Sequence, residues 1–121
     1  MNLDNFNSLI ELFFYQTEKQ NPKSVFLQWL NPNNKKTYTW EETKINIFKL
    51  SKIIKNNITE GDRCLLVSEN RPEWFIADLA IMISGGITVP AYTTYTERDY
   101  EYLINDSKPS VVIISDSLSS I

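Results

Sequence analysis

The chain has 121 residues, of which 42% are hydrophobic and 22% are charged, and its formal net charge is −3 with no histidine. This length allows one small domain with a modest core, and the sequence has no basic stripe that would favour nucleic-acid binding. Without histidine the chain contains no Ser–His or Cys–His nucleophile pair, and a zinc site is disfavoured. Because the sequence has no basic stripe, we expect no nucleic-acid partner.

The first predicted element is a helix from Ser8 to Lys19. Ser8 followed by Glu11 is the pattern of a capping box, in which each side chain bonds the backbone N–H of the other residue. Asn21-Pro22 ends this helix, because the residue before a proline avoids the helical conformation. The apolar residues expected on its inner face are Phe6, Leu9, Ile10 and Phe13.

A β-hairpin is predicted next. Two strand-like runs, Ser24–Leu30 and Thr37–Thr39, flank a cluster of Asn and Pro that predicts a turn. Lys35-Lys36 lies in this cluster and is interpreted as part of the turn.

A second helix is predicted from Trp40 to Asn56, with Thr39 as its N-cap because Glu42 follows three residues later. Lysines are spaced along what we interpret as its solvated face. The apolar residues with helical spacing are Trp40, Ile47, Leu50 and Ile54, with Ile45 and Phe48 beside them.

Residues 63–115 predict the order β-α-β-α-β. The strands are rich in Val and Ile without alternation, and the connections are short, which is typical of a parallel sheet covered by helices on its faces. The expected elements are a strand at Arg63–Ser68, a helix at Pro72–Ser84, the strand "ITVPA", a helix at Glu97–Asp106 and the strand "SVVIIS".

Local signals set the ends of these helices. Pro72 suits a first helical turn, where its missing N–H is not needed, and Gly85-Gly86 suits a helix end. The helix between them is apolar on nearly every side, so we expect burial on more than one face. Thr96 is the expected cap of the last helix, whose inward residues are predicted to be Tyr100, Leu103 and Ile104.

A parallel sheet of three strands leaves two edges exposed, and such sheets normally have more strands and helices on both faces. We therefore expect residues 1–121 to be the incomplete N-terminal portion of a larger domain. The alternative is a short protein that closes its sheet by oligomerising. In the first case the chain alone would fold poorly or aggregate, whereas a sharp melt of a monomer would favour the second.

Cys64 is the single cysteine and lies in an apolar run, so it is interpreted as a small buried side chain and not as a reactive thiol. One cysteine cannot build a disulfide framework, which favours a cytoplasmic protein. The N-terminus lacks the basic and apolar regions of a signal peptide. The longest apolar run, Trp74–Ile83, is about half the length that a membrane span needs.

Two groups of residues resemble anion-binding loops. Gly85-Gly86 is the only glycine pair, but it follows a helix, whereas a phosphate loop precedes one, so a helix stop is the better interpretation. Thr93–Thr96 is rich in hydroxyls and does precede a helix. Its N-cap at Thr96 and an otherwise exposed loop explain these hydroxyls without a ligand.

The break at Asn70-Arg71-Pro72 lies at the carboxyl end of a strand, where α/β sheets place ligands. Arg71 is able to grip a carboxylate or phosphate, yet a solvated or salt-bridged arginine is the better interpretation. The carboxylates Asp99, Glu101 and Asp106 lack a partner for catalysis, and Asp99 suits the first turn of its helix. The tryptophans at 29, 40 and 74 are interpreted as core. We assign no catalytic, cofactor-binding or metal-binding residue.

Two stretches carry a resemblance to a known family: "TYTWEE" from Thr37, and the run from Gly61 to Asp116 that contains "SENRPEW" and "TVPAY". Together they resemble the N-terminal region of long-chain fatty-acid–CoA ligases of the adenylate-forming (AMP-binding) superfamily. The resemblance covers nearly the whole chain beyond the first helix. An unrelated α/β binding or interaction module without ligase activity is the alternative.

The resemblance implies a parent that joins ATP and a fatty acid into an acyl-adenylate, which CoA then converts to a thioester, with Mg²⁺ assisting. It also implies that the residues carrying this chemistry lie downstream, so that these 121 residues alone bind no ATP, CoA or Mg²⁺ and are inactive. The implied partner is a fatty acid. Because that substrate is a lipid, peripheral contact with the inner membrane face is compatible with a cytoplasmic location.

Overall fold

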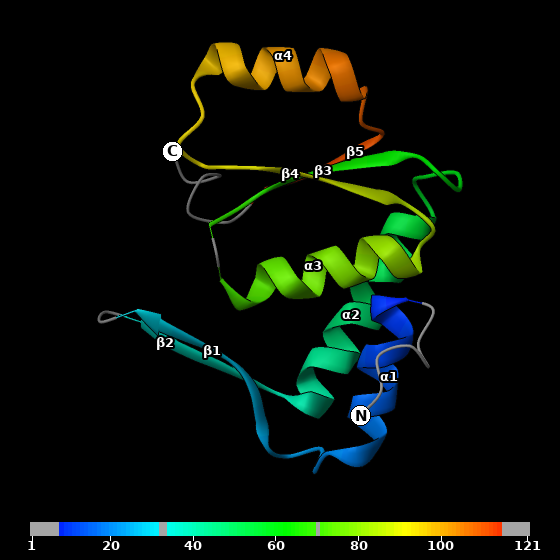
Figure 1. Ribbon diagram of the computed structural model, residues 1–121, viewed down its shortest axis with the longest axis vertical. Helices are drawn as coiled ribbons and strands as arrows, with labels where there is room; N and C mark the ends of the chain where they lie inside the picture. The colour runs from blue at the N-terminus through cyan, green and yellow to red at the C-terminus, as the bar shows by residue number, and fades with distance from the viewer. Residues whose placement is uncertain (1–7, 32–33, 70, 115–121) are drawn as a thin grey trace.

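The structure is a computed structural model that describes residues 8–31, 34–69 and 71–114. Figure 1 shows the arrangement of its helices and strands. In chain order the elements are α1 (Leu9–Lys19), β1 (Val25–Asn31), β2 (Asn34–Thr39), α2 (Trp40–Lys55), β3 (Arg63–Val67), α3 (Pro72–Ile83), β4 (Ile87–Ala91), α4 (Glu97–Ser107) and β5 (Val111–Ile114).

The larger of the two sheets is parallel, with the strand order β4-β3-β5. Helix α4 covers one face, whereas α3, α2 and α1 lie on the other (Figure 1). β1 and β2 form a separate antiparallel pair, which confirms the predicted hairpin. The predicted fold class, an α/β arrangement with β-α-β-α-β in its second half, is therefore confirmed.

The main core lies between the sheet and the three helices on the α3 side. β3 is the middle strand, and alternate residues Cys64 and Leu66 face this core with 0% and 1% exposure. α3 is buried on several sides, as its nearly continuous apolar sequence predicts, because it packs against the sheet and against α2. The other buried members are Phe13, Ile47, Ile54, Ile76, Ala77, Leu79, Ala80 and Ile81.

A smaller core fills the space under α4 on the opposite face of the sheet. Leu65 and Val67 of β3 and Ala91 of β4 are its buried members. Tyr100 and Leu103 of α4 pack against them, as their spacing predicts. The sheet is thus sandwiched between helices, and β3 is buried from both sides.

The predicted helix caps are present. Thr39 and Glu42 form a full capping box at the start of α2, and Thr96 and Asp99 form another at the start of α4. At α1 the Ser8 side-chain oxygen accepts a hydrogen bond from the Glu11 N–H at 3.1 Å. Each cap satisfies backbone donors that a helix N-terminus leaves without a partner inside the helix.

The Gly85-Gly86 pair ends α3 and starts β4. Gly85 has φ of 87°, a left-handed conformation that favours glycine, and its carbonyl accepts a bond from the Gly61 N–H at 2.8 Å. A Cβ on Gly86 would lie 3.1 Å from Ile81 Cγ2 and 3.2 Å from Cys64 Sγ, so the close approach of α3 to β3 favours glycine there. The predicted helix stop is confirmed.

The structure corrects several details of the sequence-based prediction. β2 begins at Asn34, so Lys36 lies in a strand and not in the turn. Leu9 and Ile104 were expected on inner faces but are 48% and 43% exposed. Ile45 and Phe48, which lie beside the apolar stripe of α2, are 45% and 39% exposed, and the Phe48 ring stacks on Phe14 of α1. Phe6, the side chain of Trp29 and residues 115–121 lie outside the described part of the chain.

Among the described residues, no helix combines the length and the apolar character needed to cross a membrane.

Candidate functional site

The connections of β3 and β4 leave the sheet in opposite directions. β3 runs into α3 on one face, and its neighbour β4 runs into α4 on the other face (Figure 1). In open α/β sheets, ligands bind outside the carboxyl ends of the strands at such a point of divergence, because the diverging connections leave a crevice there. The topology therefore marks the carboxyl ends of β3 and β4 as the candidate site.

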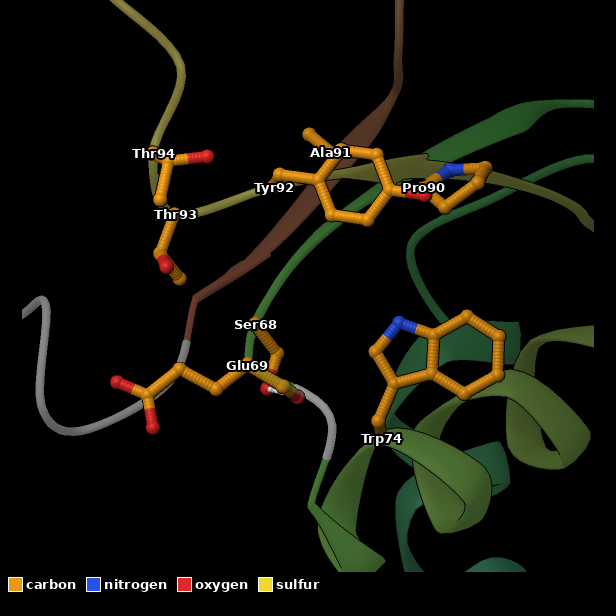
Figure 2. A pocket seen from close by; sticks show the side chains of 8 residues that line it. All are labelled: Ser68, Glu69, Trp74, Pro90, Ala91, Tyr92, Thr93 and Thr94. Carbon is orange, nitrogen blue, oxygen red and sulfur yellow. Dashed lines mark hydrogen bonds between the residues drawn. The ribbon is translucent and has the colours of Figure 1, made fainter.

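A cavity of about 570 Å³ occupies this position. We call it the switch-point crevice, and Figure 2 shows its eight lining residues. Its volume lies within the range of small-molecule sites. The lining residues are Ser68 and Glu69 after β3, Trp74 in α3, Pro90 and Ala91 in β4, and Tyr92, Thr93 and Thr94 after β4.

Tyr92 is exposed to solvent, and hydrogen bonds to its backbone carbonyl hold its loop in place. The Tyr92 carbonyl accepts hydrogen bonds from the Tyr100 hydroxyl and from the Tyr95 N–H. The Tyr95 ring contacts the Tyr92 ring edge to face, with 5.5 Å between the centroids. The Tyr92 side chain nevertheless remains 68% exposed. The loop thus holds an aromatic ring in place at the mouth of the crevice.

Trp74 forms the opposite wall from the first turn of α3. Its backbone N–H donates to the Arg71 carbonyl at 2.9 Å, which closes that turn. The indole is half-buried and also packs against the main core. In Figure 2 Tyr92 and Pro90 lie above the indole, whereas Ser68 and Glu69 lie to its left and the Glu69 carboxylate points away from it. Trp74 and Trp40 are both partly buried and pack against the main core, as predicted, and Trp74 in addition lines the crevice. The Trp40 ring stacks on that of Phe26 with 3.8 Å between the centroids.

A second cavity, of about 470 Å³, lies between β2, α2, α3 and the end of β5. At its mouth Lys36 Nζ lies 3.1 Å from Glu73 Oε1, and Arg71 Nε lies 3.7 Å from Glu73 Oε2. Burial alone would raise the pKa of Glu73, but a hydrogen bond from its own backbone and the cations Lys36 and Arg71 hold that pKa below its usual value. The interpretation of Arg71 as a salt-bridged residue is confirmed.

The N-termini of α2, α3 and α4 are not arranged as phosphate sites. A phosphate site at a helix N-terminus needs available N–H groups and positive charge. The N-termini of α2 and α4 are closed by their own capping boxes and carry acidic residues in the first turn. α3 begins with Pro72, which has no N–H, and continues with Glu73. Within the described ranges, no three acidic or sulfur side chains are grouped so as to hold a metal ion.

The structure also places the remaining candidate residues from the sequence, the threonines before α4 and the carboxylates on it. Thr96 is used as a cap, while Thr93 and Thr94 line the crevice. Asp99 bonds the Thr96 N–H in the first turn, as predicted. Glu101 and Asp106 are exposed on α4 and lie outside both cavities.

The sequence reasoning missed the pairing of Trp74 with Tyr92 across the crevice and the contact of Lys36 with Glu73. Both pairs join residues that are distant in sequence, so no local pattern signals them. The topology offers one signal, because "SENRPEW" directly follows β3 and "YTT" directly follows β4, and these two strands are neighbours in the sheet.

Comparison with known proteins identifies relatives that cover most of this chain. The family model described as "AMP-binding enzyme" matches residues 14–120. The human mitochondrial acyl-coenzyme A synthetase ACSM3 is 26% identical over 94% of this chain, which corresponds to 21% of that protein. A long-chain-fatty-acid–CoA ligase of Bacillus subtilis is 31% identical over 69% of the chain and 15% of that protein.

Solved structures share the fold. A fatty acid AMP ligase from Legionella pneumophila superimposes with a TM-score of 0.82 and 21% identity, over 99% of this chain and 22% of that protein. The N-terminal subdomain of Klebsiella oxytoca NpsA gives a TM-score of 0.75 and 22% identity, over 92% of this chain and 28% of that one. The chain spans about a fifth of the length of curated relatives such as human ACSM3. Since the family model covers nearly all of it, the chain belongs to the AMP-binding enzyme family.

Proposed function

We propose that residues 1–121 are the incomplete N-terminal portion of the large AMP-binding domain of an ATP-dependent long-chain fatty-acid–CoA ligase. In that reaction the fatty-acid carboxylate attacks the α-phosphorus of ATP and releases pyrophosphate. The CoA thiol then attacks the acyl carbonyl and releases AMP. The observation that carries this proposal is the family match over residues 14–120, which spans both strands beside the switch-point crevice.

The proposal that the parent acts on a long-chain fatty acid is supported by the relatives and by two motifs. Several relatives are acyl-coenzyme A synthetases, and one is a long-chain-fatty-acid–CoA ligase. "SENRPEW" and "TVPAY" together are the stretches that resemble the long-chain branch. In the structure β4, which contains "TVPA", pairs with β3 from Arg63↔Ile87 to Val67↔Ala91, and "SENRPEW" begins directly after β3.

The chain by itself is proposed to lack activity. Its described helix N-termini are closed by caps, proline or acidic residues, so they do not cradle phosphates. ATP, CoA and Mg²⁺ are therefore assigned to the parent protein, and none of them is assigned to the residues of this chain. The substrate of the parent is a fatty acid, and no nucleic acid takes part.

We place the parent in the cytoplasm, with peripheral contact at the inner membrane face where a lipid substrate would be collected. The test is fractionation of cells into soluble and membrane pools, with and without a salt wash. A protein that stays in the membrane after the wash would contradict this location.

The activity is tested by AMP release from ATP and Mg²⁺ in the presence of palmitate and CoA. The parent protein is expected to release AMP only when the fatty acid is present and to form palmitoyl-CoA when CoA is added. The 121-residue chain is expected to release none. A parent that forms no acyl-CoA from any fatty acid would contradict the ligase, and a preference for octanoate over palmitate would contradict the long-chain assignment alone.

A second experiment separates the domain portion from a self-contained module. The chain is expressed alone and followed by sedimentation and thermal melting. β5 has a free edge in the described structure, and its residues Val112 and Ile114 are about half exposed, which favours self-association. Aggregation or a broad transition is expected, whereas a sharp cooperative melt of a monomer would favour the module.

A further inference from the structure

Helix α3 carries a nearly buried carboxylate that no described residue neutralises. Asp78 lies in the middle of this apolar helix and is 9% exposed. Its side chain forms no hydrogen bond or ion pair with any residue in the described ranges. A carboxylate that leaves water without gaining a cation or an N–H donor destabilises the fold. The position of Asp78 therefore favours a cation as its neighbour.

Asp78 lines a third cavity, of about 410 Å³, between α3 and β4. We call this cavity the edge groove. Trp74 and Met82 lie one turn before and about one turn after Asp78, so the three residues share a face of α3. On the β4 side, Thr88 Oγ1 is buried and has no hydrogen-bond partner among the described residues. The edge groove thus combines apolar walls with a carboxylate and a hydroxyl that both lack partners, and its described lining includes no lysine or arginine.

The free edge of β4 beside this groove is poorly suited to pairing with another strand. β4 stands at the end of the strand order β4-β3-β5. The Ile87 N–H donates to the Asp62 carbonyl at 2.9 Å, and successive residues of a strand direct their backbone groups to opposite edges, so Thr88 and Pro90 direct theirs away from β3. Pro90 has no N–H to donate there. An element that covers this side of α3 and β4 would therefore use side-chain contacts and not a strand ladder.

We propose that the edge groove is the docking surface for a segment of the same polypeptide outside residues 1–121, and that this segment inserts an arginine that bonds Asp78 and Thr88. The inference rests on the proposal that the chain is a portion of a larger domain. Arginine suits the groove because its guanidinium has five N–H donors, enough for a carboxylate and a hydroxyl together. Its carbon stem and flat head also pack well on side chains such as Trp74 and Met82.

The first test maps the occupant from Met82 in the parent protein. Photo-methionine, which carries a diazirine and keeps nearly the shape of methionine, is incorporated during growth. Illumination is expected to link residue 82 to a peptide of the same polypeptide outside residues 1–121, in a product that runs as a monomer on a denaturing gel. Mass spectrometry of the digest identifies the linked peptide, which is expected to contain or adjoin an arginine.

The second test measures the charge at position 78 by thermal melting of the parent. Asp78→Asn is expected to lower the Tm by at least about 2 °C, because it breaks a buried ion pair. If no cation were present, the same change would raise the Tm, since it would remove an uncompensated charge. Asp106→Asn makes the same chemical change at an exposed position on α4 and is expected to shift the Tm by less than about 1 °C.

A double-mutant cycle joins the two tests. Replacing the arginine found by cross-linking with glutamine is expected to lower the Tm as Asp78→Asn does, and the two changes together are expected to cost less than the sum of their separate effects. Additive effects would overturn the arginine assignment.

A link from residue 82 to a second copy or to another protein, or no link to the rest of the polypeptide, would overturn the proposal. So would a Tm that is raised or unchanged by Asp78→Asn. AMP release by the wild-type parent is measured separately. An active ligase without the link would contradict the docking surface alone, whereas the link in a parent without ligase activity would contradict the ligase alone.

Discussion

Lys36 Nζ lies 3.1 Å from Glu73 Oε1, which joins the β-hairpin to the first turn of α3. The two residues are separated by α2 and β3 in the sequence. Their contact is one of several that hold the hairpin beside the second cavity. It also gives the protein a pH-dependent contribution to stability whose limits follow from the two groups.

Replacing Lys36 by methionine is expected to lower the free energy of unfolding by about 0.5 kcal/mol at neutral pH, because half of the side chain is exposed and water screens the pair. Interaction with Tyr38, followed by that with Glu73, raises the pKa of Lys36 above its ordinary 10.5, so its contribution is lost as pH rises through the folded value. The pKa of Glu73 is lowered from 4.5, so its contribution is lost as pH falls through the folded value. Thermal melts across pH test this window, with Lys49→Met as the control. A Lys36→Met deficit that does not shrink at any pH below 4.5 would contradict the ion pair.

Thr39→Ala is expected to destabilise α2 by about 1 kcal/mol. The change removes the side-chain oxygen that accepts from the Glu42 N–H at 3.0 Å, and a helix donor then loses its partner. Hydrogen exchange of peptides from residues 40–55 measures the loss locally. Thr37→Ala, at an exposed position in β2, is the matched control. Equal exchange in the two variants would show that the cap has no energetic effect.

Ile47→Ala is expected to cost about 2–5 kcal/mol, because the side chain has 0% exposure and its removal leaves a cavity between α2 and α3. Ile53 lies on the same helix with 62% exposure, so Ile53→Ala makes the same chemical change without a cavity. Its effect is expected to stay within about 0.5 kcal/mol. Urea denaturation followed by circular dichroism compares the two, and similar midpoints would contradict the packing described for α2.

Asp62, just before β3, forms a hydrogen bond with Ser110, just before β5, at the amino end of the sheet. Its Oδ2 accepts from the Thr59 N–H at 2.9 Å and from the Ser110 hydroxyl at 3.0 Å, and these bonds lower its pKa from 3.8. A lowered pKa means that the ionised group stabilises the fold above pH 3.8 and that this contribution is lost as pH falls through the folded value. Asp62→Asn is therefore expected to lower the Tm at pH 7 and to match the wild type near pH 2. A difference that is the same at both pH values would contradict this assignment.

Much of the fold could be predicted because the residues that start and end its helices act locally. Pro72, the threonine caps and the glycine pair act through the conformation of one or two residues, and the structure places each within a residue of the expected boundary. Burial was less predictable. Ile104 was expected to face inward with Tyr100 and Leu103 but is 43% exposed, since spacing reveals that a face is apolar and not whether another element covers it.

The candidate site was harder to predict than the fold. Thr93–Thr96 was recognised as hydroxyl-rich, yet the crevice depends on Trp74 and Tyr92, which only the pairing of β3 with β4 brings together. Lys36 was interpreted as a turn residue because its partner Glu73 belongs to a distant helix. Contacts of this kind follow from tertiary structure, and a single sequence has no local signal for them.

Because Cys64 is buried, chemical labelling of its thiol reports unfolding of the chain. Its thiol has 0% exposure in the middle strand, and burial together with the nearby charge of Asp62 raises its pKa, which suppresses the reactive thiolate. A thiol reagent can reach it only when helices and sheet separate. Since the 121 residues contain one cysteine, the rate of labelling within this chain measures how often β3 opens, without any engineered probe.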